Sequence, residues 1–249
     1  MIYIFTGSGI SVESGIPTFR DKKTGLWENF DPDRLCSMNS FHRNAKEIHE
    51  FYSRLRKDMF AVDENGSRIL APNHSHDMIA KWQREYGAVV MTQNVDDLHE
   101  CAGSQDVIHL HGRMEDMRCL SCGHEWSVGA TPTEYGDIHC PLCGSDNVKP
   151  GVVFFGEQAP KYEKMYDAFQ KLTDDDIIII MGTSGQVIPF DIFLNGLPGL
   201  KILNNLAPNT NEHGIELPMN TTGVFDHLIY AKASDGVDAI DDIIRKTMR

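Results

Sequence analysis

The sequence lacks any long apolar segment, because its longest uninterrupted apolar run, Ile177 to Met181, is far shorter than the ~20 residues of a membrane-spanning helix. Near Met1 it also lacks a basic segment and a small-residue cleavage site, which predicts a cytoplasmic protein with no signal peptide and no membrane partner. Basic residues are scarce: 23 lysines and arginines face 36 aspartates and glutamates, for a formal charge of −13. Nucleic-acid binders neutralise phosphates with clustered basic residues, so this balance predicts no nucleic-acid partner.

Cysteine is also scarce, with six residues among 249, and four of the six form two C-x-x-C pairs. The pairs are Cys119 with Cys122 and Cys140 with Cys143, separated by 17 residues. In a reducing compartment this spacing indicates a metal site in preference to disulfides. Four thiolates complete a closed tetrahedral zinc site, which predicts a structural zinc ion. Chance pairing and redox use remain as alternatives.

The fold class follows from six short apolar, β-branched runs, which are separated by spacers long enough to hold helices. The runs are Ile2 to Phe5, Ala88 to Thr92, Val107 to Leu110, Ile177 to Met181, Lys201 to Leu203 and His227 to Tyr230. Near-continuous apolar strands that alternate with helices predict an α/β fold with a doubly wound parallel sheet. Ligands bind such sheets at the carboxyl ends of the strands, so we expect functional residues directly after each run.

Two stretches depart from this alternation. Residues 35–80 are mostly helical in pattern, with Phe51, Leu55 and Met59 on one stripe. Residues 113–150 are rich in cysteine, glycine and proline and contain no run long enough for the main sheet. We therefore expect both to be insertions that form a smaller domain. The main domain then comprises residues 1–34, 81–112 and 151–249.

Two glycine-punctuated loops follow the first strand. The glycines of Thr6–Ser11 allow backbone N–H groups to approach a pyrophosphate, although a tight structural turn is the alternative. Val12 stands where the dinucleotide fingerprint has its third glycine, which disfavours a hydride-transfer oxidoreductase. In the next loop, Phe19 and Arg20 offer an aromatic ring and a cation for an anionic ligand, or they belong to an ordinary surface loop.

Polar side chains come directly after the second and third runs. Gln93, Asn94 and Asp96 could hold a polar ring substituent and ribose hydroxyls, whereas the alternative is an Asx-type turn with a helix cap. His109 and His111 share one face of the next strand, with His111 at its tip. An imidazole there suits a general base, although a lone histidine can equally be structural.

Taken together, these motifs resemble the sirtuin family of NAD-dependent protein deacylases along nearly the whole chain. The matching stretches, in the family's order, are TGSGIS, GIPTFR, TQNVDDLH, HLHG, the two C-x-x-C pairs, VVFFGE, GTSGQVIP and LNNLAP. The resemblance implies a Rossmann-like NAD domain with a small zinc-ribbon and helical module. NAD and the acylated lysine of a protein or peptide would meet between the two.

The resemblance also implies roles for individual residues. His111 would be the catalytic base, Gln93, Asn94 and Asp96 would line the nicotinamide side, and Phe19 and Arg20 would border the reactive ribose. The residues implied at the dinucleotide phosphates and the adenosine ribose are Gly7, Ser8, Gly9, Gly182, Thr183, Ser184 and Asn205. Those implied at the substrate strand and acyl-lysine channel are Val153, Phe155 and Val187.

The implied reaction transfers the acyl group to NAD, releases nicotinamide and leaves free lysine and O-acyl-ADP-ribose, with no part for zinc. An NAD hydrolase or mono-ADP-ribosyltransferase on the same scaffold is the alternative enzyme. A catalytically idle NAD-sensing or zinc-ribbon module is a further alternative, which intact His111, Asn94 and Asp96 disfavour. We expect the protein to be a monomer.

Departures from the family pattern concern the acyl group. Thr18 replaces the commoner aspartate, as in members that resemble the bacterial and mitochondrial group acting on acidic acyl chains. That group carries a tyrosine and, three residues later, an arginine. In this sequence the tyrosine is Tyr52, and the residue three positions later is Leu55. At 100° per residue, Arg56 lies ~40° from Tyr52 around a helix, so it shares the face of Tyr52. We hypothesise that Tyr52 and Arg56 select the acyl group, with acetyl as the default and succinyl or glutaryl as candidates; solvated arginines are the alternative.

Overall fold

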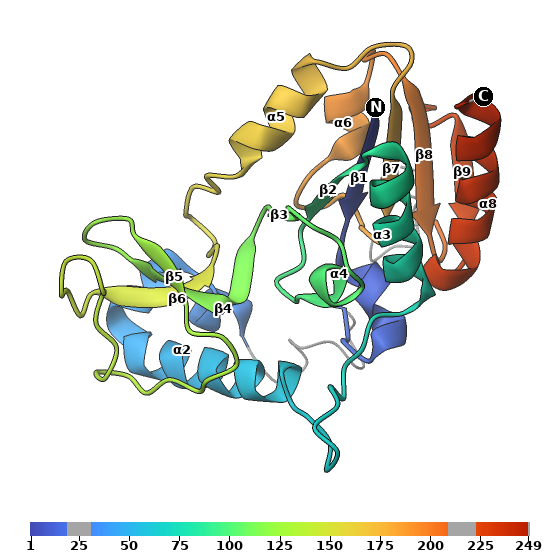
Figure 1. The fold of residues 1–249 in the computed structure, drawn as a ribbon. Helices are drawn as coiled ribbons and strands as arrows, with labels where there is room; N and C mark the ends of the chain where they lie inside the picture. The colour runs from blue at the N-terminus through green and yellow to red at the C-terminus, as the bar shows by residue number, and fades with distance from the viewer. Residues whose placement is uncertain (19–30, 209–222, 249) are drawn as a thin grey trace.

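The structure is a computed structural model that describes residues 1–18, 31–208 and 223–248. Its larger lobe contains a six-stranded sheet in the order β3-β2-β1-β7-β8-β9, and every neighbouring pair is parallel (Figure 1). The strands are β1 (Ile2–Thr6), β2 (Val89–Thr92), β3 (Ile108–His109), β7 (Ile177–Met181), β8 (Leu200–Asn205) and β9 (His227–Tyr230). Each of the six apolar runs contributes one of these strands, which confirms the predicted doubly wound α/β class. The winding reverses between β1 and β7, where such sheets bind their ligands.

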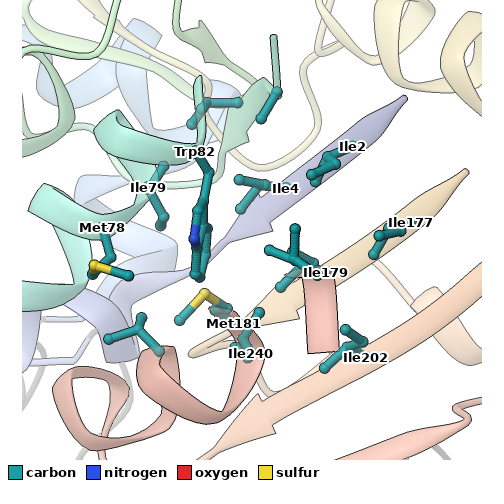
Figure 2. Close-up of a cluster of buried hydrophobic side chains, with 14 of the residues drawn as sticks. Ile2, Ile4, Met78, Ile79, Trp82, Ile177, Ile179, Met181, Ile202 and Ile240 are labelled. Atoms are coloured by element: carbon teal, nitrogen blue, oxygen red, sulfur yellow. The ribbon is translucent and has the colours of Figure 1, made fainter. Parts of the chain in front are cut away.

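Helices cover both faces of this sheet, as the continuous apolar strands require. Ile177 and Ile179 point to the face covered by α3 (His74–Tyr86) and α8 (Ala233–Thr247), where Trp82 and Ile240 pack against them (Figure 2). Ile178 points to the opposite face, which is covered by α5 (Tyr162–Gln170) and α6 (Phe190–Leu194). Because successive strand residues alternate between faces, a strand buried on both sides must be apolar throughout.

Helix α3 belongs to the larger lobe, although its first residues fall in the range 35–80 that we expected in the helical insertion. A capping box at Asn73 begins it, and Gly87, with a φ of 67°, ends it. Its apolar stripe, which includes Trp82, packs on Ile2 and Ile4 of β1. The indole N–H of Trp82 also donates to Asp241 of α8 over 2.8 Å. The helix therefore lies where its apolar stripe finds a partner.

The smaller lobe combines α1 (Pro32–Leu35) and α2 (Met38–Met59) with an antiparallel sheet in the order β5-β4-β6. These strands are β4 (Gly112–Cys119), β5 (Glu125–Ser127) and β6 (Val148–Val152). The buried face of α2 runs through Ile48, Tyr52 and Arg56, whereas the expected stripe residues Leu55 and Met59 are only half-buried. Strand β6 extends this lobe two residues beyond the expected boundary at 150 because it pairs with β4.

The remaining elements are short. They are the 3-10 helix η1 (Ser8–Ser14), directly after β1, and α4 (Leu98–Cys101), after β2. Across the described ranges, no helix combines the length and the apolar character needed to cross a bilayer.

Candidate functional site

The carboxyl ends of the central strands lie level with one another. Thr6 at the end of β1 pairs with Thr92 of β2 on one side and with Met181 of β7 on the other. Met181 in turn pairs with Asn204 of β8. The loops after these strands therefore begin at one edge of the sheet. This register brings together Gly7, Ser8, Gly9, Gln93, Asn94, Asp96, Gly182, Thr183, Ser184 and Asn205. Phe19 and Arg20 lie outside the described residues.

The glycines of the first loop hold it against the loop after β7. Gly7 donates its N–H to Met181 O over 2.9 Å, and Gly9 donates to Gly182 O over 2.8 Å. A Cβ atom on Gly9 would lie 2.8 Å from Gly182 Cα, so only glycine allows this approach. Both N–H groups are bonded to backbone carbonyls, so these two glycines serve the packing of the two loops, as in the structural turn given as the alternative. Binding of a pyrophosphate by this loop stays a prediction.

The loop after β7 is held in place by two side-chain amides. Asn205 accepts from Thr183 N–H over 3.1 Å and donates to Thr183 O over 3.0 Å, which fixes the backbone of that residue on both sides. Gln93, directly after β2, donates to Thr183 Oγ1 over 3.1 Å. The half-buried Ser8 and Ser184 stand on the same edge. Thr183, in the loop after β7, is thus bonded to the last residue of β8 and to the first residue after β2.

A buried polar chain links η1 to the loop after β2. The Asn94 amide donates to Ser11 Oγ over 3.0 Å, and Ser11 donates to Asp96 Oδ2 over 3.0 Å. Asp96 Oδ1 accepts from Leu98 N–H over 3.2 Å, so the predicted Asx-type turn is also present. Burial of the carboxylate outweighs these bonds and raises the pKa of Asp96 to about 6. Ser11 was missed by sequence reasoning, because its place at the end of TGSGIS was its sole signal.

Beneath this chain, three further buried side chains interact. Thr6 Oγ1 donates to Thr92 Oγ1 over 2.9 Å and lies 2.9 Å from His99 Nε2. Burial lowers the pKa of His99 well below its usual value, so the ring is neutral and bonds as a neutral donor or acceptor. These three residues lie buried beneath the loops at the sheet edge, and the sequence analysis assigned them no role.

His111 lies in the same region, in the turn two residues after the end of β3 and not at the strand tip that we expected, because β3 ends at His109. Its Nδ1 is 3.0 Å from Gln93 O and its Nε2 is 2.7 Å from the Tyr162 hydroxyl. Burial lowers the pKa of His111 below its usual value near 6.5, so the ring is neutral at physiological pH. A neutral, half-buried imidazole is the form that a general base requires.

His109 differs from His111 in burial and in partners. Its ring is 1% exposed and bonds on both sides, to Asn94 O over 2.9 Å and to Glu100 Oε1 over 2.8 Å. His109 therefore holds the Asn94 loop in place, and it is the residue that ends β3.

The expected substrate residues occupy different settings. Val153 is half-buried and donates its N–H to His111 O over 2.8 Å, so its segment lies directly against His111. Phe155 and Val187 are 51% and 47% exposed, an unusual degree for apolar side chains. Phe155 also borders an open hollow of about 600 Å³ that is lined mainly by polar residues of α1 and α2.

Tyr52 and Arg56 share one helix face, as the helix geometry predicts, but that face is turned into the smaller lobe. Tyr52 stacks on Phe154 with ring centroids 5.5 Å apart. Arg56 is 0% exposed and donates to Met114 O over 2.9 Å and to Thr133 Oγ1 over 3.0 Å. Arg56 is therefore neither solvated nor directed at an open pocket, and its observed contacts are structural.

The four paired cysteines converge at one corner of the smaller lobe. All four Sγ atoms lie within 4.8 Å of one another, with Cys119 and Cys143 3.6 Å apart and Cys122 and Cys140 also 3.6 Å apart. A disulfide requires ~2.05 Å, whereas four sulfurs at ~2.3 Å from a tetrahedral zinc stand ~3.8 Å apart. The donor set thus fits one zinc ion, and four thiolates leave no position for a substrate. The predicted structural zinc site is confirmed in its ligands and geometry.

Comparison with known proteins gives consistent matches over most of the chain. The model of the Sir2 family matches residues 7–189. An NAD-dependent protein deacylase of Helicobacter hepaticus is 34% identical over 254 residues, which cover 96% of this chain and 95% of that protein. One from Aquifex aeolicus is 35% identical over 251 residues, covering 98% and 95%. The crystal structure of a Sir2 homologue in complex with NAD superposes with a TM-score of 0.78 at 32% identity, covering 100% of this chain and 90% of that one.

Proposed function

The chain belongs to the Sir2 family, and from that premise we propose that it is an NAD-dependent deacylase that removes acyl groups, acetyl by default, from protein lysines. The observation that carries the proposal is the position of His111, a neutral imidazole at the edge where the loops after β1, β2 and β7 meet. A base at that edge lies beside the place where a doubly wound sheet binds a nucleotide.

The loops at this edge are our proposed NAD site. When bound, NAD supplies the ribose carbon that takes the acyl oxygen as nicotinamide leaves, so that the acyl group ends on ADP-ribose. The half-buried Ser8 and Ser184 offer hydroxyl donors at the edge, and Asn205 and Gln93 keep Thr183 in position. We assign the phosphates and adenosine ribose to Gly7, Ser8, Gly9, Gly182, Thr183, Ser184 and Asn205, and the reactive ribose to Phe19 and Arg20.

Three residues carry the proposed chemistry of the chain itself. The Nδ1–H group of His111 donates to Gln93 O. The other ring nitrogen, Nε2, therefore carries the lone pair and accepts the proton of a ribose hydroxyl. Asn94 and Asp96 are our proposed nicotinamide residues, and their bonds through Ser11 hold both side chains at the sheet edge. Preorganised polar groups of this kind orient a ligand without moving during the reaction.

For the substrate, we propose that the acylated peptide adds as an extended strand beside Val153 and Phe155, opposite Val187. Exposed apolar side chains on two separate loops are suited to cover the aliphatic part of an acyl-lysine. Succinyl and glutaryl groups stay secondary candidates, because the contacts of Arg56 lie inside the smaller lobe. The cytoplasmic location and the monomeric state are proposals that rest on the sequence.

The test is an assay with NAD and a panel of acetyl, succinyl and glutaryl peptides, read by mass spectrometry. We expect one nicotinamide and one O-acyl-ADP-ribose for each lysine released, with the acetyl peptide preferred. His111→Ala should lower this rate by roughly 100-fold or more while NAD still binds, and His42→Ala, at an exposed histidine of α2, should not. NAD loss that ignores the peptide would support the hydrolase or ADP-ribosyltransferase alternative. Near-normal turnover by His111→Ala would remove His111 from the mechanism.

A further inference from the structure

The base nitrogen of His111 faces a side chain that the motifs and the proposed reaction leave unexplained. The Tyr162 hydroxyl lies 2.7 Å from His111 Nε2, and the two ring centroids are 5.8 Å apart. Tyr162 is the first residue of α5, and it comes 51 residues after His111 in the chain. The atom that we propose takes a proton from the substrate is therefore already hydrogen-bonded.

The direction of this hydrogen bond follows from the other side of the ring. Gln93 O, 3.0 Å from Nδ1, can only accept, so the single proton of the neutral imidazole lies on Nδ1. Nε2 then carries a lone pair, and the Tyr162 hydroxyl must donate to it. Burial raises the pKa of Tyr162 to about 12, which keeps that hydroxyl protonated.

Packing holds the hydroxyl in this place. The Tyr162 ring packs against the cluster around Phe5 on one face of the parallel sheet and meets the Tyr166 ring edge-on at 6.4 Å. Tyr166 in turn contacts Phe193 of α6, with ring centroids 5.6 Å apart. The chain between Val153 and Tyr162 thus touches His111 twice, through the backbone bond of Val153 at its carbonyl and through Tyr162 at its ring.

We propose that Tyr162 is a positioning residue for His111: its hydroxyl donates to Nε2, holds the ring as the Nδ1–H tautomer in the free protein, and yields that place to a ribose hydroxyl during the reaction. The first part concerns the protein alone, and the last part rests on the proposed function. The groups bonded to His111 from the neighbouring elements are the Gln93 carbonyl, the Val153 N–H and the Tyr162 hydroxyl, and all three are uncharged.

This arrangement has a measurable consequence for the free protein. A donor at the lone pair stabilises the neutral ring, so removing the hydroxyl should raise the pKa of His111. The net strength of one such hydrogen bond corresponds to a shift of roughly 0.5 to 1 pH unit. Tyr162→Phe deletes the hydroxyl and keeps the packed ring, and Tyr166→Phe deletes an exposed hydroxyl one helical turn away as the matched control.

The experiment is an NMR titration of the His111 ring in the free protein, for wild type and both variants. We expect the wild-type ring to be protonated on Nδ1 when neutral, and its pKa to rise in Tyr162→Phe and to stay unchanged in Tyr166→Phe. Equal pKa values in all three proteins, or a neutral ring protonated on Nε2, would overturn the proposal.

The pH profile of kcat/KM for deacylation gives a second readout, because it reports ionisations of the free enzyme. Its acid limb should move to higher pH by the same amount in Tyr162→Phe. The plateau should stay far above that of His111→Ala, and a plateau as low as His111→Ala would instead make Tyr162 a catalytic group and refute a positioning role. A titration shift in a protein without deacylase activity would support the positioning of His111 and refute the proposed function, so the two failures are distinguishable.

Discussion

Replacing Asp96 by asparagine should make the protein more stable at neutral pH. The carboxylate is 4% exposed, and burial raises its pKa from 3.8 to about 6 despite bonds from Ser11 and Leu98 N–H. The asparagine oxygen can still accept from Leu98 N–H, and its amide can donate to Ser11 Oγ, which reverses the direction of that hydrogen bond. The substitution therefore removes the buried charge and leaves a hydrogen-bond partner at both Leu98 N–H and Ser11 Oγ.

The magnitude follows from the linkage between ionisation and folding. The folded pKa of Asp96 lies about 2 units above the unfolded value, which is worth about 3 kcal/mol at 1.36 kcal/mol per unit. Because the folded pKa is the higher one, the stability associated with the protonated carboxyl is fully present below pH 3.8 and is lost as the pH rises through about 6. The advantage of the asparagine variant should thus be about 3 kcal/mol at pH 8 and roughly half of that at pH 5.

Urea unfolding of wild type and Asp96→Asn at pH 8 and pH 5 measures this difference. Asp167→Asn, at an exposed aspartate of α5, is the matched control and should change stability little at either pH. A variant that loses stability at pH 8, or gains the same amount at both pH values, would refute the reasoning. From its proposed place beside nicotinamide, the same variant should deacylate more slowly, so stability and activity should change in opposite directions.

The remaining predictions concern the smaller lobe. The purified protein should contain about one zinc per chain by elemental analysis. Removal of zinc by a chelator should unfold this lobe, because structural zinc sites contribute ~10 to 16 kcal/mol to folding. An apo protein that melts normally would contradict a structural role. Arg56→Ala should lower the free energy of unfolding by about 2 to 4 kcal/mol through its lost buried bonds, whereas the exposed Arg54→Ala should change it by less than about 0.5 kcal/mol. The order of preference among acetyl, succinyl and glutaryl peptides should be the same in both arginine variants, and a changed order in Arg56→Ala would restore its role as an acyl selector.

Much of the architecture was predictable because its signals are local. The run from Ile177 to Met181 is apolar at every position, and only a strand buried on both faces requires that pattern. The two C-x-x-C pairs likewise carry their geometry in their spacing, since each pair binds a metal from one short turn. The edge of the sheet that holds the candidate site also followed, because parallel strands end together.

Other features depended on contacts between distant segments. Helix periodicity correctly placed Arg56 beside Tyr52, but it could not say whether their shared face meets an open pocket or the interior of the smaller lobe. Similarly, the glycines of the first loop were recognisable, but the carbonyls that accept from their N–H groups, those of Met181 and Gly182, lie 174 and 173 residues away in the chain. A periodic pattern describes one element, and the partner of a face is decided by the packing of all elements.

The sequence by itself determined the parallel sheet, the four-cysteine site and the candidates at the strand ends, because strand periodicity, ligand spacing and turn chemistry act over a few neighbouring residues. Only the tertiary structure decided that Ser11 joins Asn94 to Asp96 and that Tyr162 meets His111. Those bonds join residues between 51 and 85 positions apart, and such distances close only when the whole chain has packed.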